Sequence, residues 1–304
     1  MKKGWKYSLL LVTAFLVTAG AIAQFQGQGG GRGRGGGRGF GGGRGGGEGS
    51  YRATEITTDR GNTPNWPLDE SIPHDVFTFT RIKYHSSGYE QTSYAWFTDY
   101  RDADLNLSYR LQQMTSLKIN PEPQVVELTD PRLFDYPWVF MSGAGNIVLT
   151  DQEAKNLGKY LLNGGFLMVD DFWGQDEWDG WYHAIKQALP DLEPVDLPRS
   201  HPIFNCLFPL PEDLSLQTPN IGQASRNRGT GVTWEDNHGG GNTRDPHFRA
   251  IFDKKGRMIV MICHNTDNGD GWEEESVDPW FFREYSEKKN FPLGINIIFY
   301  TLTH

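Results

Sequence analysis

The chain has 304 residues, with 29 Lys and Arg against 38 Asp and Glu, for a formal net charge of −9. Residues 1–23 and 24–49 each carry +3, which leaves −15 for residues 50–304. Such an acidic region excludes nucleic acid as its ligand, because phosphate recognition needs a positive surface. Residues 76–304 have the length of one ordinary α/β domain.

Residues 1–23 have the pattern of a secretory signal peptide. Three lysines precede an apolar run from 9 to 21, and Ala21-Ile-Ala23 matches an Ala-x-Ala cleavage site. We therefore expect an exported protein, periplasmic or extracellular. The run is nearly long enough for an uncleaved anchor, and only in that case would the protein be attached to a membrane.

Residues 24–50 are predicted to form a disordered linker. Sixteen of the 37 glycines lie between 27 and 49, with four arginines among them, and this composition cannot bury a core. Arg-Gly repeats often bind RNA in cytosolic proteins, but export makes a solvated spacer, or a weak cationic tether to anionic polymers, the better interpretation. Residues 51–75 are polar and contain several prolines, so we expect an arm laid over the domain.

From residue 76 onward, strand patterns alternate with helix patterns. This alternation predicts a doubly wound α/β fold with a mostly parallel sheet and a β-hairpin addition. The expected elements are strands at 76–84, 125–128, 136–141 and 166–169, helices at 102–117, 151–163 and 178–189, a hairpin over 249–263 with a glycine turn, and a buried closing helix at 291–303.

The most informative segment is Gly164-Gly-Phe-Leu-Met-Val-Asp-Asp171. Four apolar residues between a glycine pair and an acidic pair indicate a short buried strand. The helix before it has Thr150 as a candidate N-cap, and Gly164 is placed to be its C′ glycine. Ligands of parallel sheets bind beyond the carboxyl ends of the strands. Asp170 and Asp171 therefore mark the expected binding edge.

Four strand ends should converge on this edge, and we take their polar or glycine residues, with the nearby Trp173, as candidate ligand-binding residues: Tyr84, Gly143, Asp170, Trp173, His264 and Asp267. Carboxylates with imidazoles could bind a divalent metal. Adjacent buried carboxyls could also work as an acid/base pair, because their pKa values separate. The structural alternatives are that Asp171 caps the following turn, Asp170 accepts backbone hydrogen bonds and His264 is a satisfied core histidine.

Other patterns leave alternatives open. Asp267 to Glu273 has the composition of a calcium loop without the spacing of an EF-hand, so we assign no metal and no cofactor. The aromatic stripe from Trp178 to Leu189 suits a core face or a sugar platform. Residues 191–247 form a long, weakly periodic segment of the kind that is usually functional or mobile. Cys206 and Cys263 are either a disulfide or free thiols.

Two resemblances follow from the motifs. The order Asp135-Tyr-Pro-Trp-Val-Phe-Met-Ser-Gly-Ala-Gly145, helix, Gly164 to Asp171 is similar to the class I glutamine amidotransferase-like fold, a flavodoxin-like sheet. More closely, residues 76–304 resemble a family of exported bacterial proteins, domain of unknown function family 4159. The matching stretches are Phe77–Tyr84, Gly164–Gly174, Ser200–Ile203 and Asn296–His304.

The amidotransferase resemblance implies a nucleophile elbow with Cys-x-Gly after the strand. This chain has Asp170-Asp171 there, and its next glycine is Gly174, so amidotransferase activity is predicted to be absent. His201, which precedes a proline, resembles a His-Pro of sugar-utilisation relatives of that fold rather than a catalytic dyad.

We therefore predict a binding module for a small polar ligand, such as a carbohydrate, or for an envelope protein. The ligand would lie over Asp170, Asp171, Trp173 and His201. The first alternative is a hydrolase of a glycan or amide, with Asp171 as base or nucleophile and His201 as its partner. The second is an envelope scaffold that uses the Gly/Arg linker to reach other proteins.

Overall fold

The computed structural model describes residues 59–68, 76–87, 95–236, 238, 240–273 and 276–304. All of them belong to a compact unit that spans Gly47–His304. The expected signal peptide and Gly/Arg linker lie outside the described residues, as does the arm except for 59–68. In that stretch the indole N–H of Trp66 donates to the carbonyl of Ile119 at 2.9 Å, and its ring stacks on Tyr109.

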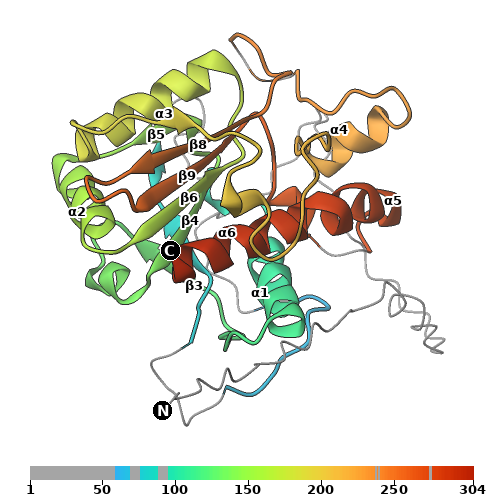
Figure 1. Ribbon diagram of the computed structural model, residues 1–304, viewed down its shortest axis with the longest axis horizontal. Coiled ribbons are helices and arrows are strands. Elements are labelled where there is room, and N and C mark those ends of the chain that lie inside the picture. Colours follow the sequence, from blue (N-terminus) through green and yellow to red (C-terminus); the bar gives the residue numbers. More distant parts are fainter. Residues whose placement is uncertain (1–58, 69–75, 88–94, 237, 239, 274–275) are drawn as a thin grey trace, which may run out of the picture. The chain divides into compact units, whose positions relative to one another are not determined.

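A seven-stranded sheet with the order β3-β1-β4-β6-β9-β8-β7 forms the centre of this unit (Figure 1). Five neighbouring strands, β3 to β9 in that order, run parallel, and β8 and β7 add antiparallel pairings at one edge. The bounds are β1 Thr80–Lys83, β3 Gln124–Glu127, β4 Trp138–Ser142, β6 Phe166–Asp170, β7 Val195–Asp196, β8 His247–Phe252 and β9 Met258–His264. The predicted mostly parallel α/β sheet with a β-hairpin addition is thus confirmed.

Counted among themselves along the chain, the five parallel strands have the order 2-1-3-4-5. The direction in which strands are added therefore reverses between β1 and β4. Connections leave to opposite faces of the sheet at such a point, and ligands of doubly wound sheets bind there. A small antiparallel pair, β2 His85–Ser86 with β5 Ile147–Val148, lies beyond the same strand ends.

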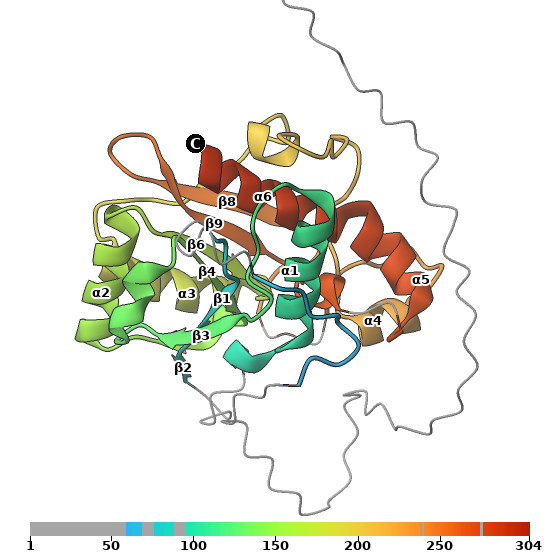
Figure 2. The ribbon, with the colours of Figure 1, turned by 90° about the horizontal axis from the view of Figure 1, so that it is seen from below.

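Helices cover both faces of the sheet (Figures 1 and 2). On one face α1 and α6 pack against alternate sheet residues such as Phe140 and Met168, and on the other α2 and α3 pack against Met141 and Val169. The helix bounds are α1 Asp102–Met114, α2 Asp151–Leu162, α3 Gly174–Ala188, α4 Ile221–Arg226, α5 Pro279–Phe281 and α6 Phe291–Thr303, with a π-helix at Phe282–Asn290 between the last two.

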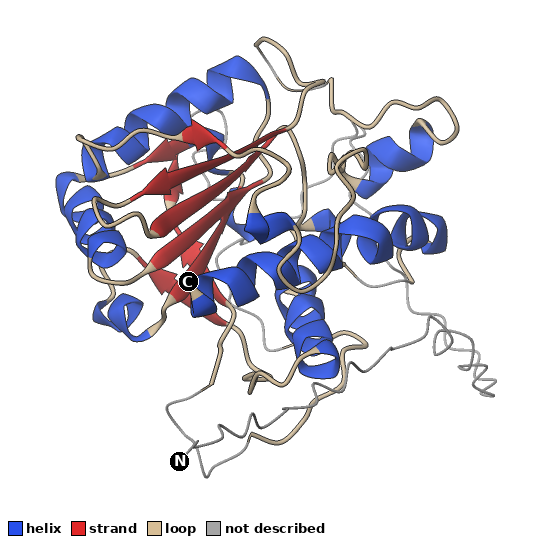
Figure 3. Cartoon of the chain, viewed as in Figure 1, coloured by secondary structure: helices blue, strands red, loops and turns tan. Residues whose placement is uncertain are grey.

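Short 3-10 turns and loops connect these elements, and Figure 3 shows the long 191–247 segment as mostly loop. The turns are η1 Ala95–Phe97, η2 Pro131–Asp135, η3 Ala144–Asn146, η4 Pro202–Phe204 and η5 Asp270–Trp272. In the part of the chain described here, no helix is both long and apolar enough to cross a bilayer.

The local signals around α2 and β6 are confirmed. Thr150 and Glu153 form a capping box, in which the Thr150 hydroxyl accepts from the Glu153 N–H and the Glu153 carboxylate from the Thr150 N–H. The helix is followed by Gly164 at φ 116°, a conformation that favours glycine. β6 then pairs with β4 so that Asp170 lies level with Ser142, which aligns the two strand ends.

The aromatic stripe of α3 is core rather than a sugar platform. Trp181, Ile185 and Leu189 are buried against the sheet, and Trp178 packs on His264 and under the Arg249 guanidinium. The two cysteines are free thiols rather than a disulfide.

A fully buried ion pair joins β1 to α1. Arg81 Nε lies 3.1 Å from both carboxylate oxygens of Asp104, and neither side chain is exposed to solvent. The Arg81 guanidinium also donates to the carbonyls of Trp96 and Thr98, immediately before Asp99. This pair therefore fixes the segment that carries the chain from the β1 end into α1.

Arg81→Met should lower the free energy of unfolding by about 3–5 kcal/mol, because the Asp104 carboxylate would stay buried without its partner. Urea unfolding followed by tryptophan fluorescence measures this loss. Lys83→Met, on the same strand but in an exposed pair with Glu127, should cost less than about 1 kcal/mol. Equal losses in the two variants would contradict the role given to the buried pair.

Candidate functional site

The chain makes a sharp turn directly after β6. Asp171 has a φ of 54°, its N–H donates to the carbonyl of Thr266 at 3.2 Å, and α3 begins three residues later. Its Oδ1 accepts from the indole N–H of Trp173 at 3.1 Å. Asp99 and Asn265, on the neighbouring connections, also have a positive φ. Left-handed residues other than glycine are uncommon, and they gather at functional sites.

Asp170 fastens the loop after β9 to the central strand. It is fully buried, and its oxygens accept from the Asn268 N–H at 2.7 Å, the Asn268 side-chain amide at 2.7 Å and the Gly269 N–H at 3.0 Å. Burial raises its pKa to about 7, although these hydrogen bonds oppose the shift. All of these contacts are internal, so the side chain positions the loop.

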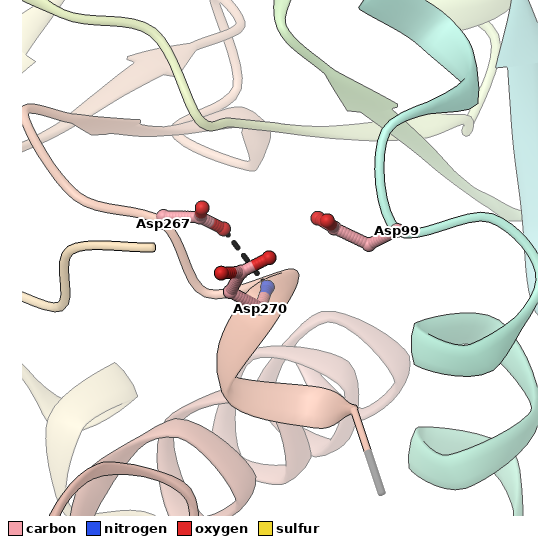
Figure 4. Close-up of side chains that lie close together, drawn as sticks. All are labelled: Asp99, Asp267 and Asp270. Atoms are coloured by element: carbon pink, nitrogen blue, oxygen red, sulfur yellow. Dashed lines mark hydrogen bonds between the residues drawn. The ribbon is translucent and has the colours of Figure 1, made fainter. Parts of the chain in front are cut away.

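Three carboxylates point toward one another at this edge (Figure 4). Asp267 and Asp270 come from the loop after β9, and Asp99 comes from the connection between β1 and α1. Each offers one oxygen, and these oxygens all lie within 4.8 Å of one another. A Cβ at position 269 would lie 2.1 Å from Asp99 Oδ2, so the close approach of Asp99 to the loop requires Gly269.

These carboxyls and Asp171 form one electrostatically coupled group. Burial raises the pKa of Asp267 well above its ordinary value, and Asp171, Asp270 and Asp99 raise it further. Burial likewise raises the pKa of Asp171, with Glu235 and Asp170 adding to the shift. The pKa of Asp99 is also well raised, first by burial and then by Asp270. Ionising all of these carboxyls together would therefore place more negative charge at the edge than the surroundings neutralise.

His238 is a cation that interacts electrostatically with Asp171. Its Nδ1 lies 2.9 Å from Glu177 Oε1 and its Nε2 lies 3.1 Å from Glu235 Oε2, and its ring stacks on Trp173. Burial alone would lower the pKa of His238, but the hydrogen bonds to the two glutamates outweigh it and raise the pKa to about 10. At neutral pH the ring is an imidazolium with both N–H groups engaged.

The long segment before β8 frames the site. It supplies Glu235 and His238, and its backbone at Thr218 accepts from the Asp267 N–H at 2.7 Å. The Asn265 side chain donates to the carbonyls of Asn242 and Asp245 and accepts from the Gly174 N–H. The segment is therefore tied to the β9 loop and to the start of α3.

The structure brings part of the predicted set together. Four of its members lie together at this edge: Asp170, Asp171, Trp173 and Asp267. Their hydrogen bonds and their electrostatic effects on one another, described above, show this proximity. Trp173 is 0% exposed, and its ring stacks on His238.

The remaining predicted residues support the edge or lie elsewhere. The Tyr84 hydroxyl donates to the Ser142 carbonyl at 2.6 Å, and the Gly143 N–H donates to the Asp170 carbonyl at 3.0 Å. His264 is buried: its Nε2 donates to the Gly174 carbonyl at 2.9 Å, and burial lowers its pKa to about 4. Its contacts are those of a satisfied core histidine.

The expected pairing of Asp171 with His201 does not form. His201 lies at the start of η4, where its ring meets Tyr300 near the end of α6 and its Nδ1 accepts from the Ile203 N–H. The imidazole that neighbours Asp171 is that of His238.

Sequence reasoning missed Asp99, Asp270, Glu235 and the role of His238. Asp270 lies within the Asp267-Asn-Gly-Asp motif, so its signal was present. Asp99 follows no recognisable pattern, and only the β1–α1 connection brings it to the edge.

A family model with the description Domain of unknown function (DUF4159) matches residues 78–302. The chain belongs to this family. The resemblance predicted from the sequence is thereby confirmed at the level of the family. No curated protein matches the chain. The family description names no reaction and no ligand, so the geometry of the carboxylate edge has to support any function.

A groove of about 280 Å³ lies at the opposite, amino edge of the sheet. It is lined mainly by Leu162, Leu189, Pro190 and Leu192, with Asp191 and Lys254 at its rim. This groove holds no cluster of buried ionisable groups comparable with that at the carboxyl edge.

His238→Gln should change the pH dependence of stability. The pKa of His238 is about 10 in the folded chain against 6.5 ordinarily, so its contribution is complete below pH 6.5 and is lost as the pH rises through 10. The stability of the wild type relative to the variant should therefore fall by up to about 1.4 kcal/mol per pH unit between pH 7 and 9.5. Denaturant unfolding across this range measures it, and parallel curves would exclude the imidazolium.

Proposed function

We propose that the protein is a binding module for a small polar ligand that is neutral or cationic, held at the carboxyl edge of the sheet around Asp171. The observation that carries the proposal is the surplus of buried and half-buried carboxyls at this edge. Asp171 interacts electrostatically with Glu235, Asp170 and His238, and Asp267 with Asp171, Asp270 and Asp99. His238 offsets part of this charge, and it is shared with Glu177.

A surplus of this kind selects the chemistry of a ligand. Buried carboxylates without a counter-charge are unfavourable, so a group that donates hydrogen bonds or brings positive charge is stabilised there. Hydroxyl and ammonium groups do so, whereas a carboxylate or phosphate would add repulsion. A sugar or polyol would bind through hydroxyl hydrogen bonds alone, since Trp173 is covered.

The location of the edge supports the same proposal. The strand order 2-1-3-4-5 is the flavodoxin-like order, in which ligands bind at the point where the order reverses. The positive φ of Asp171 between β6 and α3 corresponds to the elbow of an amidotransferase-like fold with aspartate in place of the nucleophilic cysteine. We infer such a fold, exported from a bacterial cell, as the context of the binding site.

Asp171→Asn tests the binding function. Asparagine keeps the oxygen that accepts from Trp173 and tolerates the left-handed φ, so the fold is retained. Without a ligand the variant should unfold at the same free energy or up to about 2 kcal/mol higher, because a functional carboxylate is held at a cost to stability. Thermal unfolding with monosaccharides, lysine, putrescine and succinate provides the binding measurement.

We expect at least one neutral or cationic probe to raise the melting temperature of the wild type and not of Asp171→Asn, with succinate inactive. Tyr182→Phe, which removes an exposed hydroxyl on α3 that donates to Glu193, is the control and should respond like the wild type. The proposal is wrong if succinate stabilises as well as the other probes, or if the stabilisation survives in Asp171→Asn.

The elbow conformation of Asp171 favours hydrolysis of a glycan or amide as a second candidate, because a strand–turn–helix elbow exposes a nucleophile. His201 contacts Tyr300 and the Ile203 N–H instead of this turn, so the His238 imidazolium would serve as the acid. Chromogenic glycosides and amides test the reaction. Turnover should fall at least about 100-fold in Asp171→Asn, and turnover that persists in this variant would exclude the mechanism.

A further inference from the structure

We propose that Asp99, Asp267 and Asp270 form a binding site for a hard divalent cation, with calcium as the ion that their carboxylate oxygens suit best. The inference goes beyond the proposed function, because the cation site holds whether or not the edge also takes a small organic ligand. It assigns to these three side chains a role that their hydrogen bonds do not account for.

The donor set and its spacing select the ion. All three side chains offer carboxylate oxygens, which hard cations prefer, and no thiolate or imidazole is among them. The three oxygens lie within 4.8 Å of one another. Oxygens bound to one Ca²⁺ at about 2.3–2.6 Å lie at most about 5.2 Å apart, and this spacing stays within that limit. Calcium takes about six to eight oxygens in a flexible geometry, whereas Mg²⁺ demands a near-ideal octahedron, so calcium fits three fixed carboxylates with the least movement.

An unpartnered buried oxygen points to a missing ligand. Asp99 Oδ2 is inaccessible to solvent and accepts no hydrogen bond from an N–H or hydroxyl group of the described residues; its neighbours are the Asp270 carboxyl and Gly269. Figure 4 shows the Asp99 side chain directed at the other two carboxylates. A buried carboxylate oxygen without a donor costs free energy, so its place is explained by a group of positive charge between the three.

The two carboxylates opposite Asp99 are rigidly held. Asp267 is 2% exposed, and its Oδ1 accepts from the Asp270 N–H at 2.9 Å. Asp270 Oδ2 accepts from the Ile221 N–H at 2.5 Å. Each keeps a second oxygen for a cation. Among the described residues, no lysine or arginine forms an ion pair with any of the three.

Hydrogen bonds connect the loop that carries Asp267 and Asp270 to the residues around it. Asn268 donates to Asp170 and accepts from Asn290, and Asn290 also donates to the Thr218 hydroxyl. The Trp272 indole N–H donates to the Asn290 carbonyl at 2.9 Å. The loop is thus preorganised by residues that are not themselves ligands, as in a built metal site, where outer contacts orient the donors.

Calcium titration of the full chain, stripped of cations with a chelator, tests the site. Calorimetry should give one equivalent of Ca²⁺ bound, and the melting temperature should rise with each tenfold increase in Ca²⁺. Mg²⁺ and Mn²⁺ are titrated in parallel and should bind more weakly. Asp267→Asn should weaken Ca²⁺ binding by at least about 10-fold while its chelated form melts no lower than the wild type, because a repulsive charge is removed.

Gly269→Ala is the matched variant that changes no charge. Its added Cβ would displace Asp99 Oδ2, so it too should lose at least about 10-fold in calcium affinity. Asp191→Asn removes one exposed charge at the opposite edge and should bind calcium like the wild type. The inference is overturned if no cation binds at millimolar concentration, or if Asp191→Asn loses as much affinity as Asp267→Asn.

The two proposals fail separately. If calcium binds and none of the organic probes has an effect, the cation site is supported and the proposed small-ligand function is wrong. If a probe binds in excess chelator and calorimetry detects no calcium binding, the small-ligand function is supported and the cation site is wrong.

Discussion

The hydrogen bonds of Asp170 are the constraint on which the carboxyl edge depends. This residue ends the central strand, and its carboxyl group receives three donors from Asn268 and Gly269. The loop after β9 therefore has one position relative to β6, and Asp267 and Asp270 keep their places against mutual repulsion. A site on rigid, hydrogen-bonded backbone holds its donors more precisely than a free loop does.

Buried ionisable groups occur in this chain in two different arrangements, a neutralised pair and a group of carboxyls. In the core, Arg81 and Asp104 neutralise each other and are satisfied by further hydrogen bonds, so the pair acts as a structural joint. At the edge, by contrast, Asp99, Asp171 and Asp267 repel one another when ionised, and burial raises the pKa of each. Stability alone does not favour such an arrangement, and this contrast is the physical reason for looking for function at the edge.

The sequence predicted what depends on short-range pattern. The strand at 166–170, its capped helix and the carboxylates at its end follow from local periodicity, and their position at the edge follows from the rules of parallel sheets. Asp99 could not be found in this way, because its place depends on the buried pair of Arg81 and Asp104. The sequence also could not show whether His201 or His238 lies near Asp171. Both belong to a segment with little periodicity, and tertiary contacts determine the path of such a segment.

The carboxylates come from three connections far apart in the chain, and the contact between Asp170 and Asn268 alone spans 98 residues. Closing loops of this size costs entropy before any contact rewards it, so such contacts form late in folding. No single βα unit contains the cluster. In a partly folded chain whose N-terminal half alone had folded, these aspartates would be separated from one another and hydrated. The charge surplus is thus a property of the completed sheet, and the ionisation of these groups reports on whether the last parallel strand has docked.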